Sequence, residues 1–339
     1  MIKIIKKFIR KFTLKSPLTL FDGWGSEVNN FTQLGNFNLN SKEIFYIIRR
    51  NPGTGFFSNL TFILNHLLIA KKFNFIPIID MEKYKTIYNE RKMIKKTFNA
   101  WEYYFEQLTN HNLKEIYKYK KFIITDNKFY PFFYYDMSKI PQVEDLLKTL
   151  KLKKNIIKMI NLINIPQKTL GVHFRGTSYK RSPGHPFPAT VKQMSTLVDK
   201  ILREYKYQKI FLSTEESHYL NFFKKKYGEK IIYLKNVYRS KNNDAFTVYP
   251  RLNHRYKLGR EILIETMLLS RCDCFIYLCS NVSSAAIAFN ENRKQIRIEI
   301  KNGFNSKHEL VSQLLWYIKK NLPESIGGFS NKIKHEINQ

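Results

Sequence analysis

The stretch that decides the fold is TLGVHFRGTSYKRSPGHPFPA, which runs from Thr169 to Ala189. Its first six residues are rich in β-formers, and apolar positions alternate with smaller or polar ones, so Thr169 to Phe174 is predicted to form a strand. Gly176 permits a tight turn directly after it. Arg175 therefore places a cation with five hydrogen-bond donors at the carboxyl end of a strand, where α/β sheets bind their ligands.

Strands and helices alternate regularly on the carboxyl side of this stretch. Strands are predicted near 169–174, 209–213, 231–235, 273–279 and 295–300, and helices near 190–206, 215–227, 260–271, 281–290 and 306–321. This alternation is typical of a doubly wound α/β domain.

The first half of the chain shows the same pattern over a shorter range. A strand near 44–50, a helix over 58–72 and a strand over 73–80 predict a right-handed βαβ unit. We therefore expect a basic amphipathic segment at 1–15, an α/β domain at 16–165, a second at 166–322, and a loose tail at 323–339.

The composition is strongly basic. The 339 residues include 58 Lys and Arg against 27 Asp and Glu, a formal net charge of +31. Such a charge attracts nucleic acid, anionic lipid, or a phosphorylated or nucleotide-linked substrate. An AT-rich genome, which favours Lys, Asn and Ile codons, explains much of the excess equally well.

The first twelve residues, MIKIIKKFIRKF, place apolar residues at helical spacing, with Lys and Arg mostly on the other side. This pattern is typical of a helix that lies on an anionic membrane surface. A helix packed on the body of the protein, with a solvated basic face, fits the pattern as well.

The sequence lacks a run of about 20 apolar residues that could span a membrane, and its start lacks the features of a signal peptide. We therefore expect a cytoplasmic protein, peripheral to the inner face of the membrane if the first helix binds there. Cys272, Cys274 and Cys279 crowd into one predicted strand and are expected to be buried core residues without a disulfide.

Five segments together resemble a known family. They are GTGFFSNL, GVHFRGTSYK, GHPFP, IFLSTEES and the long stretch NHRYKLGREILIETMLLSRCDCFIYLCSNVSSAAIAF. In this order they resemble the GDP-fucose-dependent α-1,6-fucosyltransferases and protein O-fucosyltransferases, over roughly residues 44–75 and 168–300. The resemblance implies the GT-B arrangement, two Rossmann-like domains that face a cleft, with the acceptor on the amino-terminal domain and the nucleotide-sugar on the carboxyl-terminal one.

The family motif at the end of the strand has the form H-x-R-R-x-D, which His173 and Arg175 match. The resemblance implies that Arg175 contacts the nucleotide diphosphate, where a guanidinium would stabilise the charge that develops as the sugar leaves. A structural salt bridge is the alternative role for Arg175. Gly176 and Ser178 depart from the motif, so the exact donor sugar stays open.

Other positions match the family's donor site. By resemblance Glu215, Glu216 and Glu265 would accept hydrogen bonds from the nucleotide, although acidic residues also stabilise the first turn of a helix. Ser280 and Asn281 lie between a strand and a helix and would bind phosphate, with ordinary helix capping as the alternative.

The amino-terminal half offers a second set of candidates. Gly53, Gly55 and Asn59 resemble the glycine-rich turn and asparagine at the family's cleft, whereas a plain strand-to-helix turn is the alternative. Glu102 lies beside Trp101 in NAWEYYFEQ, which suits stacking on a sugar but also core packing. Glu102, Glu215 and His185 are the candidates for a general base.

The function that the sequence favours is a metal-independent, inverting glycosyltransferase. It would move fucose or a related sugar from a GDP-sugar, its donor substrate, to a bacterial surface glycan, with no cofactor; a D-x-D pair and a phosphate-binding P-loop are both missing from the sequence. Nucleic acid is not the expected partner. The rival interpretation is a basic membrane-surface or nucleic-acid-binding protein that keeps the fold without transferase activity.

Overall fold

A computed structural model describes most of the chain. The described residues are 44–50, 54–118, 122–125, 134–241, 244–290, 294–331 and 333–338. The expectations for residues 1–15, including the membrane helix at 1–12, and for Gly53 lie outside the described residues.

The chain divides into two compact units, Met1–Lys151 and Leu152–Gln339. The second unit thus begins at Leu152, on the amino-terminal side of the boundary expected at residue 166. Helix α6 (Lys154–Asn161) therefore belongs to the second unit, where it packs against α9 (His254–Leu269).

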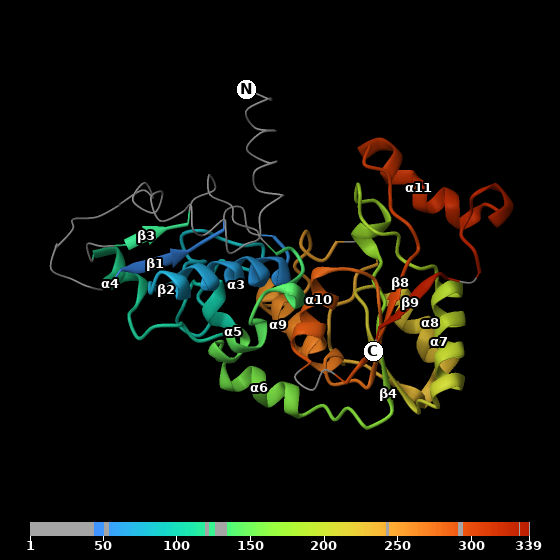
Figure 1. Cartoon of the computed structure of the whole chain (residues 1–339), viewed down its shortest axis with the longest axis horizontal. Helices are drawn as coiled ribbons and strands as arrows, with labels where there is room; N and C mark the ends of the chain where they lie inside the picture. Colours follow the sequence, from blue (N-terminus) through green and yellow to red (C-terminus); the bar gives the residue numbers. More distant parts are fainter. Residues whose placement is uncertain are drawn as a thin grey trace. The chain divides into compact units, whose positions relative to one another are not determined.

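The first unit is built on a short parallel sheet (Figure 1). Its described elements are β1 (Phe45–Ile48), α3 (Phe56–Lys72), β2 (Ile76–Ile79), η2 (Ala100–Tyr103), α4 (Leu113–Lys118), β3 (Phe122–Ile124), η3 (Met137–Lys139) and α5 (Val143–Thr149). The strand order is β2-β1-β3, and β1 pairs in parallel with both neighbours. All four residues of β1 are buried, as expected for a central strand covered on both faces. The predicted strand-helix-strand order over 44–80 is confirmed.

The second unit holds the larger sheet. After α6 come β4 (Thr169–His173), η4 (Thr177–Lys180), α7 (Val191–Tyr205), β5 (Lys209–Ser213), α8 (Ser217–Tyr227), η5 (Gly228–Lys230), β6 (Ile231–Ile232), α9, β7 (Cys274–Tyr277), α10 (Asn281–Ala288), β8 (Ile296–Ile300), α11 (Glu309–Asn321), η6 (Glu324–Ile326) and β9 (His335–Asn338). The sheet order among the described strands is β6-β5-β4-β7-β8-β9, and all but the last pair are parallel.

This order fixes where a ligand can bind. Numbered within the unit, the parallel strands run 3-2-1-4-5, the order of a doubly wound fold, so the predicted α/β class is confirmed. The chain leaves β4 toward β5 on one side, and β7 lies on the other side of β4. The switch point of this topology is therefore the carboxyl edge between β4 and β7, the place where open α/β sheets bind ligands.

Helices cover both faces of this sheet (Figure 1). On one face Leu170, Val172 and Phe174 pack in a buried cluster with residues of α7 and α8. On the other face α9 contacts β4 and β5. Alternate residues of β4 thus point toward different helices, as the pleat requires.

The end of the described chain corrects one expectation. Residues 323–339 were expected to form a loose tail, but β9 pairs antiparallel with β8, with Ile337 opposite Ile298. β9 covers the edge of β8 that would otherwise be unpaired. Its sequence, HEIN, is short and mostly polar, so it did not indicate a strand.

The cysteines correct a second expectation. Cys272 and Cys274 are buried, as predicted, whereas Cys279 is exposed. The reason is that β7, all of whose residues are buried, ends at Tyr277, two residues earlier than the predicted strand, so Cys279 lies outside the sheet.

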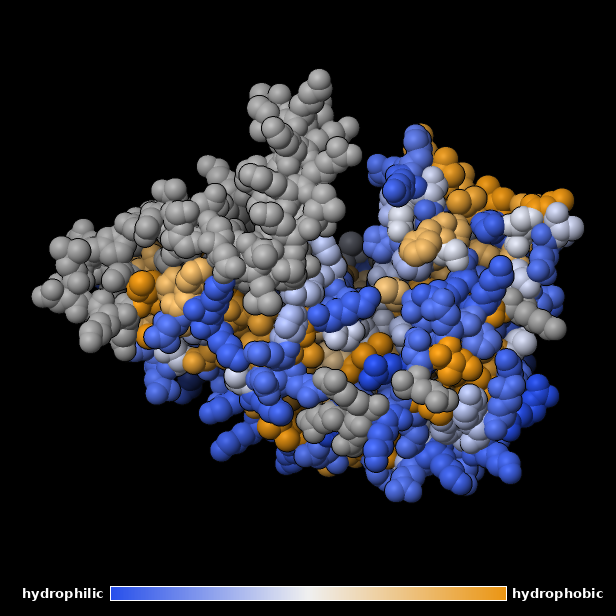
Figure 2. All heavy atoms as spheres, in the orientation of Figure 1, coloured by the Kyte–Doolittle hydropathy of each residue, from blue (hydrophilic) through white to orange (hydrophobic). Residues whose placement is uncertain are grey.

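The visible surface is mostly polar, with an apolar strip along α11 (Figure 2). Leu310, Leu314 and Ile318 are exposed there, while Ser312 and Trp316 on the opposite side of the helix are buried. Among the helices of the described chain, none has the length and apolar character needed to cross a membrane.

We predict that Phe174→Ala lowers the free energy of unfolding by about 3–5 kcal/mol, because it empties a fully buried site. The Phe174 ring stacks on Tyr219 at 3.8 Å between centroids. Urea unfolding followed by tryptophan fluorescence measures the loss. Phe222→Ala, on an exposed ring of the same helix as Tyr219, is the control and should cost less than about 1 kcal/mol. Equal losses in the two variants would contradict the assignment of Phe174 to the core.

Candidate functional site

Arg175 lies at the switch point of the larger sheet. It follows β4 directly, and its Nη2 donates to Ser178 Oγ at 3.2 Å. Its guanidinium carbon lies 4.6 Å from the centre of the Tyr179 ring, a cation–π contact. The side chain is 23% exposed, and Nη1 makes no hydrogen bond within the described chain. Arg175 is thus held in place on one side while one edge of its guanidinium stays accessible.

Glu215, just after β5, holds this loop from the neighbouring strand. Its Oε1 accepts hydrogen bonds from the Gly176 backbone N–H at 3.0 Å and the Thr177 hydroxyl at 2.7 Å. The same oxygen lies 3.5 Å from Arg175 Nε, an ion pair rather than a hydrogen bond. Burial raises the pKa of Glu215, but Arg175, His173 and the two hydrogen bonds outweigh it and leave the pKa below its ordinary value. Glu215 therefore stays ionised.

Glu216 holds the other end of the loop. Its two oxygens accept from Lys180 Nζ at 2.6 and 2.8 Å, and Oε1 also accepts from the Thr177 backbone N–H. His218 Nδ1 lies 3.0 Å from Oε2. Both partners of the Glu216–Lys180 pair are almost fully buried. Glu216 is the first residue before α8, yet its side chain does not cap that helix, because it is engaged by the loop instead.

Gly176 has a steric reason to be glycine. A Cβ at this position would lie 1.9 Å from Glu216 Oε1 and 2.9 Å from Tyr219 Cε2. The space that a larger side chain would need is thus filled by the carboxylate of Glu216. This explains in physical terms why the sequence departs from H-x-R-R-x-D at this position.

Glu265 on α9 belongs to an internal network under the same edge. Its Oε2 accepts from the Ser213 hydroxyl at 2.8 Å and its Oε1 from Arg239 Nη2 at 3.0 Å. Burial raises the pKa of Glu265 to about 7, although Arg239 and Ser213 act in the opposite direction. Both oxygens of Glu265 thus accept hydrogen bonds, and the bond from Ser213 holds the end of β5.

His173, the last residue of β4, is also buried. Burial lowers its pKa to about 4, so the ring is neutral at physiological pH. Its Nδ1 has no hydrogen-bond partner among the described residues.

Ser280 and Asn281 differ in their roles at the start of α10. Ser280 forms a capping box with Ser283: its hydroxyl accepts from the Ser283 N–H at 3.2 Å, and its own N–H donates to the Ser283 hydroxyl at 2.9 Å. Its side chain therefore serves the helix, as the capping alternative predicted. Asn281 is exposed at the amino end of α10, the helix that follows β7, and β7 is the strand next to β4.

His185 is brought to the same loop as Arg175. Its ring centre lies 4.8 Å from that of Tyr179, which also contacts the Arg175 guanidinium. His185 Nδ1 lies 3.0 Å from the Pro183 carbonyl, and the ring is exposed. The two residues that the sequence singled out thus share one aromatic neighbour.

In the first unit, Gly55 and Asn59 form the turn into α3. Asn59 is buried, accepts from the Thr54 N–H at 3.0 Å and donates to the Thr54 carbonyl at 2.9 Å. Arg50 Nη1 donates to the Thr54 and Ser58 hydroxyls at 2.9 and 2.8 Å. The side-chain groups of Asn59 are therefore used to fix the turn, while nothing lies within 4 Å of a Cβ built at Gly55.

Glu102 is engaged by its own loop. It accepts from the Thr97 hydroxyl at 2.7 Å, from Gln107 Nε2 at 3.0 Å and from Asn99 Nδ2 at 3.3 Å. Trp101 is buried and stacks on Phe105 at 4.3 Å. This part of the chain follows the core-packing alternative.

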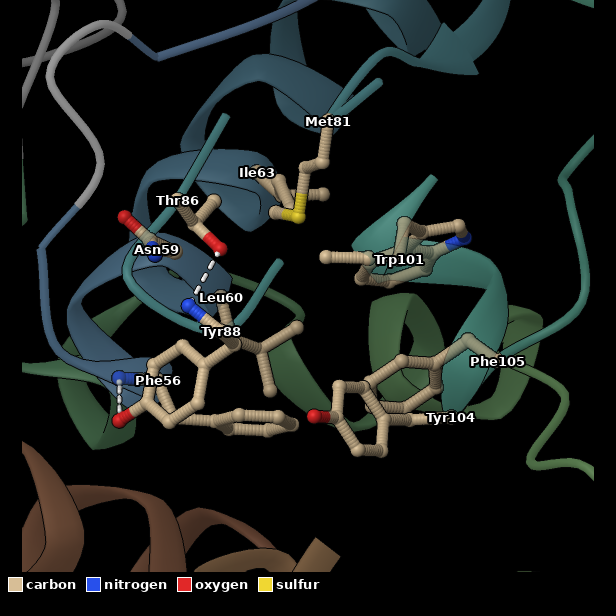
Figure 3. Close-up of a pocket in the computed structure, with 11 residues that line it drawn as sticks. Phe56, Asn59, Leu60, Ile63, Met81, Thr86, Tyr88, Trp101, Tyr104 and Phe105 are labelled. Carbon is tan, nitrogen blue, oxygen red and sulfur yellow. Dashed lines mark hydrogen bonds between the residues drawn. The ribbon is translucent and has the colours of Figure 1, made fainter. Parts of the chain in front are cut away.

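Trp101 borders an aromatic pocket of the first unit (Figure 3). Phe56, Tyr88, Tyr104 and Phe105 also line it, and the Phe56 N–H donates to the Tyr88 hydroxyl at 3.1 Å. The free volume is about 20 Å³. This is room for little more than one water molecule, so a sugar does not fit inside.

The sequence did not single out Tyr179 or Arg239, which orient Arg175 and Glu265. Tyr179 lies on η4 and Arg175 lies ahead of it, so no helical spacing in the sequence marks their contact. Arg239 lies in an irregular segment far from Glu265 in sequence, and no local pattern marks it.

The fold is similar to that of solved fucosyltransferases. The NodZ α-1,6-fucosyltransferase co-crystallized with GDP matches at 16% identity and a TM-score of 0.49, over 79% of this chain and 97% of that one. Fucosyltransferase NodZ from Bradyrhizobium matches at 16% identity and 0.48, over 77% and 96%. POFUT1 in complex with GDP matches at 11% identity and 0.44, over 74% and 95%.

The two NodZ proteins are fucosyltransferases. No protein-family model matches the chain, and no curated protein matches it significantly.

We predict that Lys180→Met lowers the free energy of unfolding by about 3–5 kcal/mol, because it leaves the buried Glu216 carboxylate without its cation. The double variant Lys180→Met/Glu216→Gln removes both charges and should recover at least half of that loss. Urea unfolding of the two variants and the wild type tests this. A double variant that is as unstable as the single one would show that the ion pair is not the cause.

We also predict a pH dependence of stability from Glu265. The folded pKa, about 7, lies above the ordinary value of 4.5, so the folded state holds a proton that the unfolded state has lost. The resulting stabilisation is fully present below pH 4.5 and is lost as the pH rises to about 7. Glu265→Gln should therefore lose less stability than the wild type between pH 5 and pH 7.5, measured as the shift in urea midpoint. Parallel pH profiles for the two proteins would refute this.

Proposed function

We propose that this protein is a metal-independent, inverting glycosyltransferase. It transfers fucose or a related sugar from a GDP-sugar to a glycan acceptor of the bacterial surface, at the inner face of the membrane. Two lines of observation support the proposal: the five ordered segments that resemble the fucosyltransferases, and the geometry around Arg175.

The accessible edge of Arg175 is the observation that carries the proposal. When the bond between sugar and β-phosphate breaks, negative charge grows on the phosphate oxygens. A guanidinium that is fixed in advance stabilises this charge without reorganising, and it can donate two parallel hydrogen bonds. Tyr179, Ser178 and Glu215 fix Arg175 from behind, while Nη1 is left for the ligand.

The remaining residues of the edge would act on the donor in different ways. The amino end of α10 with exposed Asn281 adds backbone donors and a partial positive charge for a phosphate. Glu216 and Glu265 use both oxygens within the protein, and Glu215 uses Oε1, so we assign all three the task of holding the loop and the strand end. The buried His173, the last residue of β4, is neutral at physiological pH and adds no charge.

The acceptor hydroxyl must lose a proton during transfer. Of the three candidates, Glu102 has three hydrogen bonds to its own loop, and Glu215 is bound to the Arg175 loop. His185 is exposed and lies next to Tyr179, so it is the candidate base that we favour. A dissociative reaction needs little help from a base, so we expect Arg175 to contribute more than His185.

We predict that Arg175→Ala lowers sugar transfer by about a hundredfold or more, since a charge contact that strengthens in the transition state contributes on the order of 3 kcal/mol. Arg175→Lys keeps the charge but loses the two-pronged contact, so transfer falls here too. The donor is first selected by thermal shift with GDP-, UDP-, CMP- and dTDP-sugars, because ligand binding raises the melting temperature. Transfer is then measured with the selected donor.

Arg203→Ala is the matched control, because Arg203 is exposed on α7 away from the edge. It should leave transfer unchanged. An Arg175→Ala protein with native melting and near-native transfer would refute the assignment. If Arg175→Ala unfolds instead, Arg175 is a structural salt-bridge residue.

A further inference from the structure

A groove of about 700 Å³ lies in the second unit, beside the loop that carries Arg175. It is lined by Lys180 at the end of η4, by the first turns of α7 and α8, and by the second half of α11. A smaller hollow of about 340 Å³ shares Lys180, His218 and Tyr317 with it and extends to Thr177. The Thr177 hydroxyl donates to Glu215, which pairs with Arg175, so the smaller hollow adjoins the residues that hold Arg175.

The groove is electropositive. Lys180, Lys192 and Lys320 line it, and Arg181 and Lys241 line the adjoining hollow. Among the described residues, the one acid in either lining is Glu216, whose charge is matched by Lys180 at 2.6 Å. Both α7 and α8 begin here, and the amino end of a helix carries a partial positive charge. An anionic ligand is therefore favoured.

Aromatic rings form the rest of the lining. Phe222 and Tyr317 are 38% and 37% exposed, so their faces can stack on the apolar face of a sugar ring. Tyr219 also lines the groove; it is 1% exposed, and its hydroxyl has no hydrogen-bond partner among the described residues. A buried hydroxyl without a partner is costly, so this donor marks the floor of the groove as a place where a polar ligand binds.

We infer that this groove binds an acidic oligosaccharide, which is the acceptor of transfer. The sugar rings lie on Phe222 and Tyr317, while carboxylate or phosphate groups pair with Lys192 and Lys320. The volume is that of a small-molecule pocket, about 300–1,000 Å³. Beyond it, the outer face of α11 exposes Leu310, Leu314 and Ile318 rather than cations, which disfavours a continued nucleic-acid track. The class of ligand, an acidic oligosaccharide, is inferred from the lining of the groove alone. That this ligand is the acceptor of transfer rests on the proposed function.

The test uses the full chain and isothermal calorimetry with three hexameric probes: hexagalacturonate, neutral maltohexaose and the oligonucleotide hexathymidylate. We expect hexagalacturonate to bind and maltohexaose to bind at least about tenfold more weakly, because charge pairs distinguish the two. Lys192→Glu/Lys320→Glu should weaken hexagalacturonate binding by at least about tenfold. Tyr317→Ala should weaken it with no change in net charge.

The matched control is Lys225→Glu/Lys230→Glu. These two exposed lysines of the same unit lie outside the groove, and the variant has the same net charge as the groove variant. It should bind hexagalacturonate within about twofold of the wild type, since solvent and salt screen exposed charges that do not contact the ligand. Equal losses in both double variants, equal binding of maltohexaose, or tighter binding of hexathymidylate would each overturn the inference.

The thermal shift with GDP separates this inference from the proposed function. A wild type that responds to GDP but does not bind hexagalacturonate refutes the groove and leaves the transferase proposal standing. A wild type that binds hexagalacturonate, with the loss confined to the groove variants, but does not respond to any nucleotide-sugar supports the groove as an acidic-glycan site and refutes its role as acceptor site for a transferase.

Discussion

The Glu215 and Glu216 carboxylates determine the shape of the site. They follow β5, yet their hydrogen bonds go across to the loop after β4, to Gly176, Thr177 and Lys180. Two adjacent residues thereby fix both ends of a 3-10 helix that would otherwise be a free surface loop. Since Arg175 and Tyr179 belong to this loop, the direction of the guanidinium depends on acids that do not need to touch a ligand. The groove depends on them as well, because Lys180 forms part of its lining.

This arrangement also resolves the charge balance at the edge. Arg175, Lys180 and Arg239 each lie within ion-pair distance of a glutamate oxygen, so each of these cations has an acidic partner inside the protein. Other lysines of the described second unit, such as Lys192, Lys225 and Lys320, are exposed. Attraction and recognition of an anionic substrate are therefore due to different residues. Exposed charges attract the substrate at long range, whereas the few cations that are held in place provide specificity.

Much of the fold could be predicted from the sequence because its strands are apolar and its helices amphipathic, as in β4 and α7. The prediction failed where tertiary contacts determine the conformation or the exposure of a segment. The HEIN segment becomes β9 only because β8 offers an open edge, and the exposure of Cys279 depends on where β7 stops pairing. For the site, the position of Arg175 followed from the strand end and the turn, but the tasks of Glu215 and Glu216 did not, since a carboxylate that holds a loop and one that binds a ligand look alike in sequence.

The space beside Gly176 constrains how this sequence can change over time. A side chain at 176 and a carboxylate at 216 occupy the same volume, so the two positions cannot be altered independently. A substitution at 176 is unfavourable until Glu216 has become shorter, and a shorter residue at 216 first leaves Lys180 buried without its anion. Either single step passes through a less stable protein. Gly176 and Glu216 are therefore expected to change together rather than one at a time. Variants with a second arginine in the loop should arise only together with changes at 180 and 216.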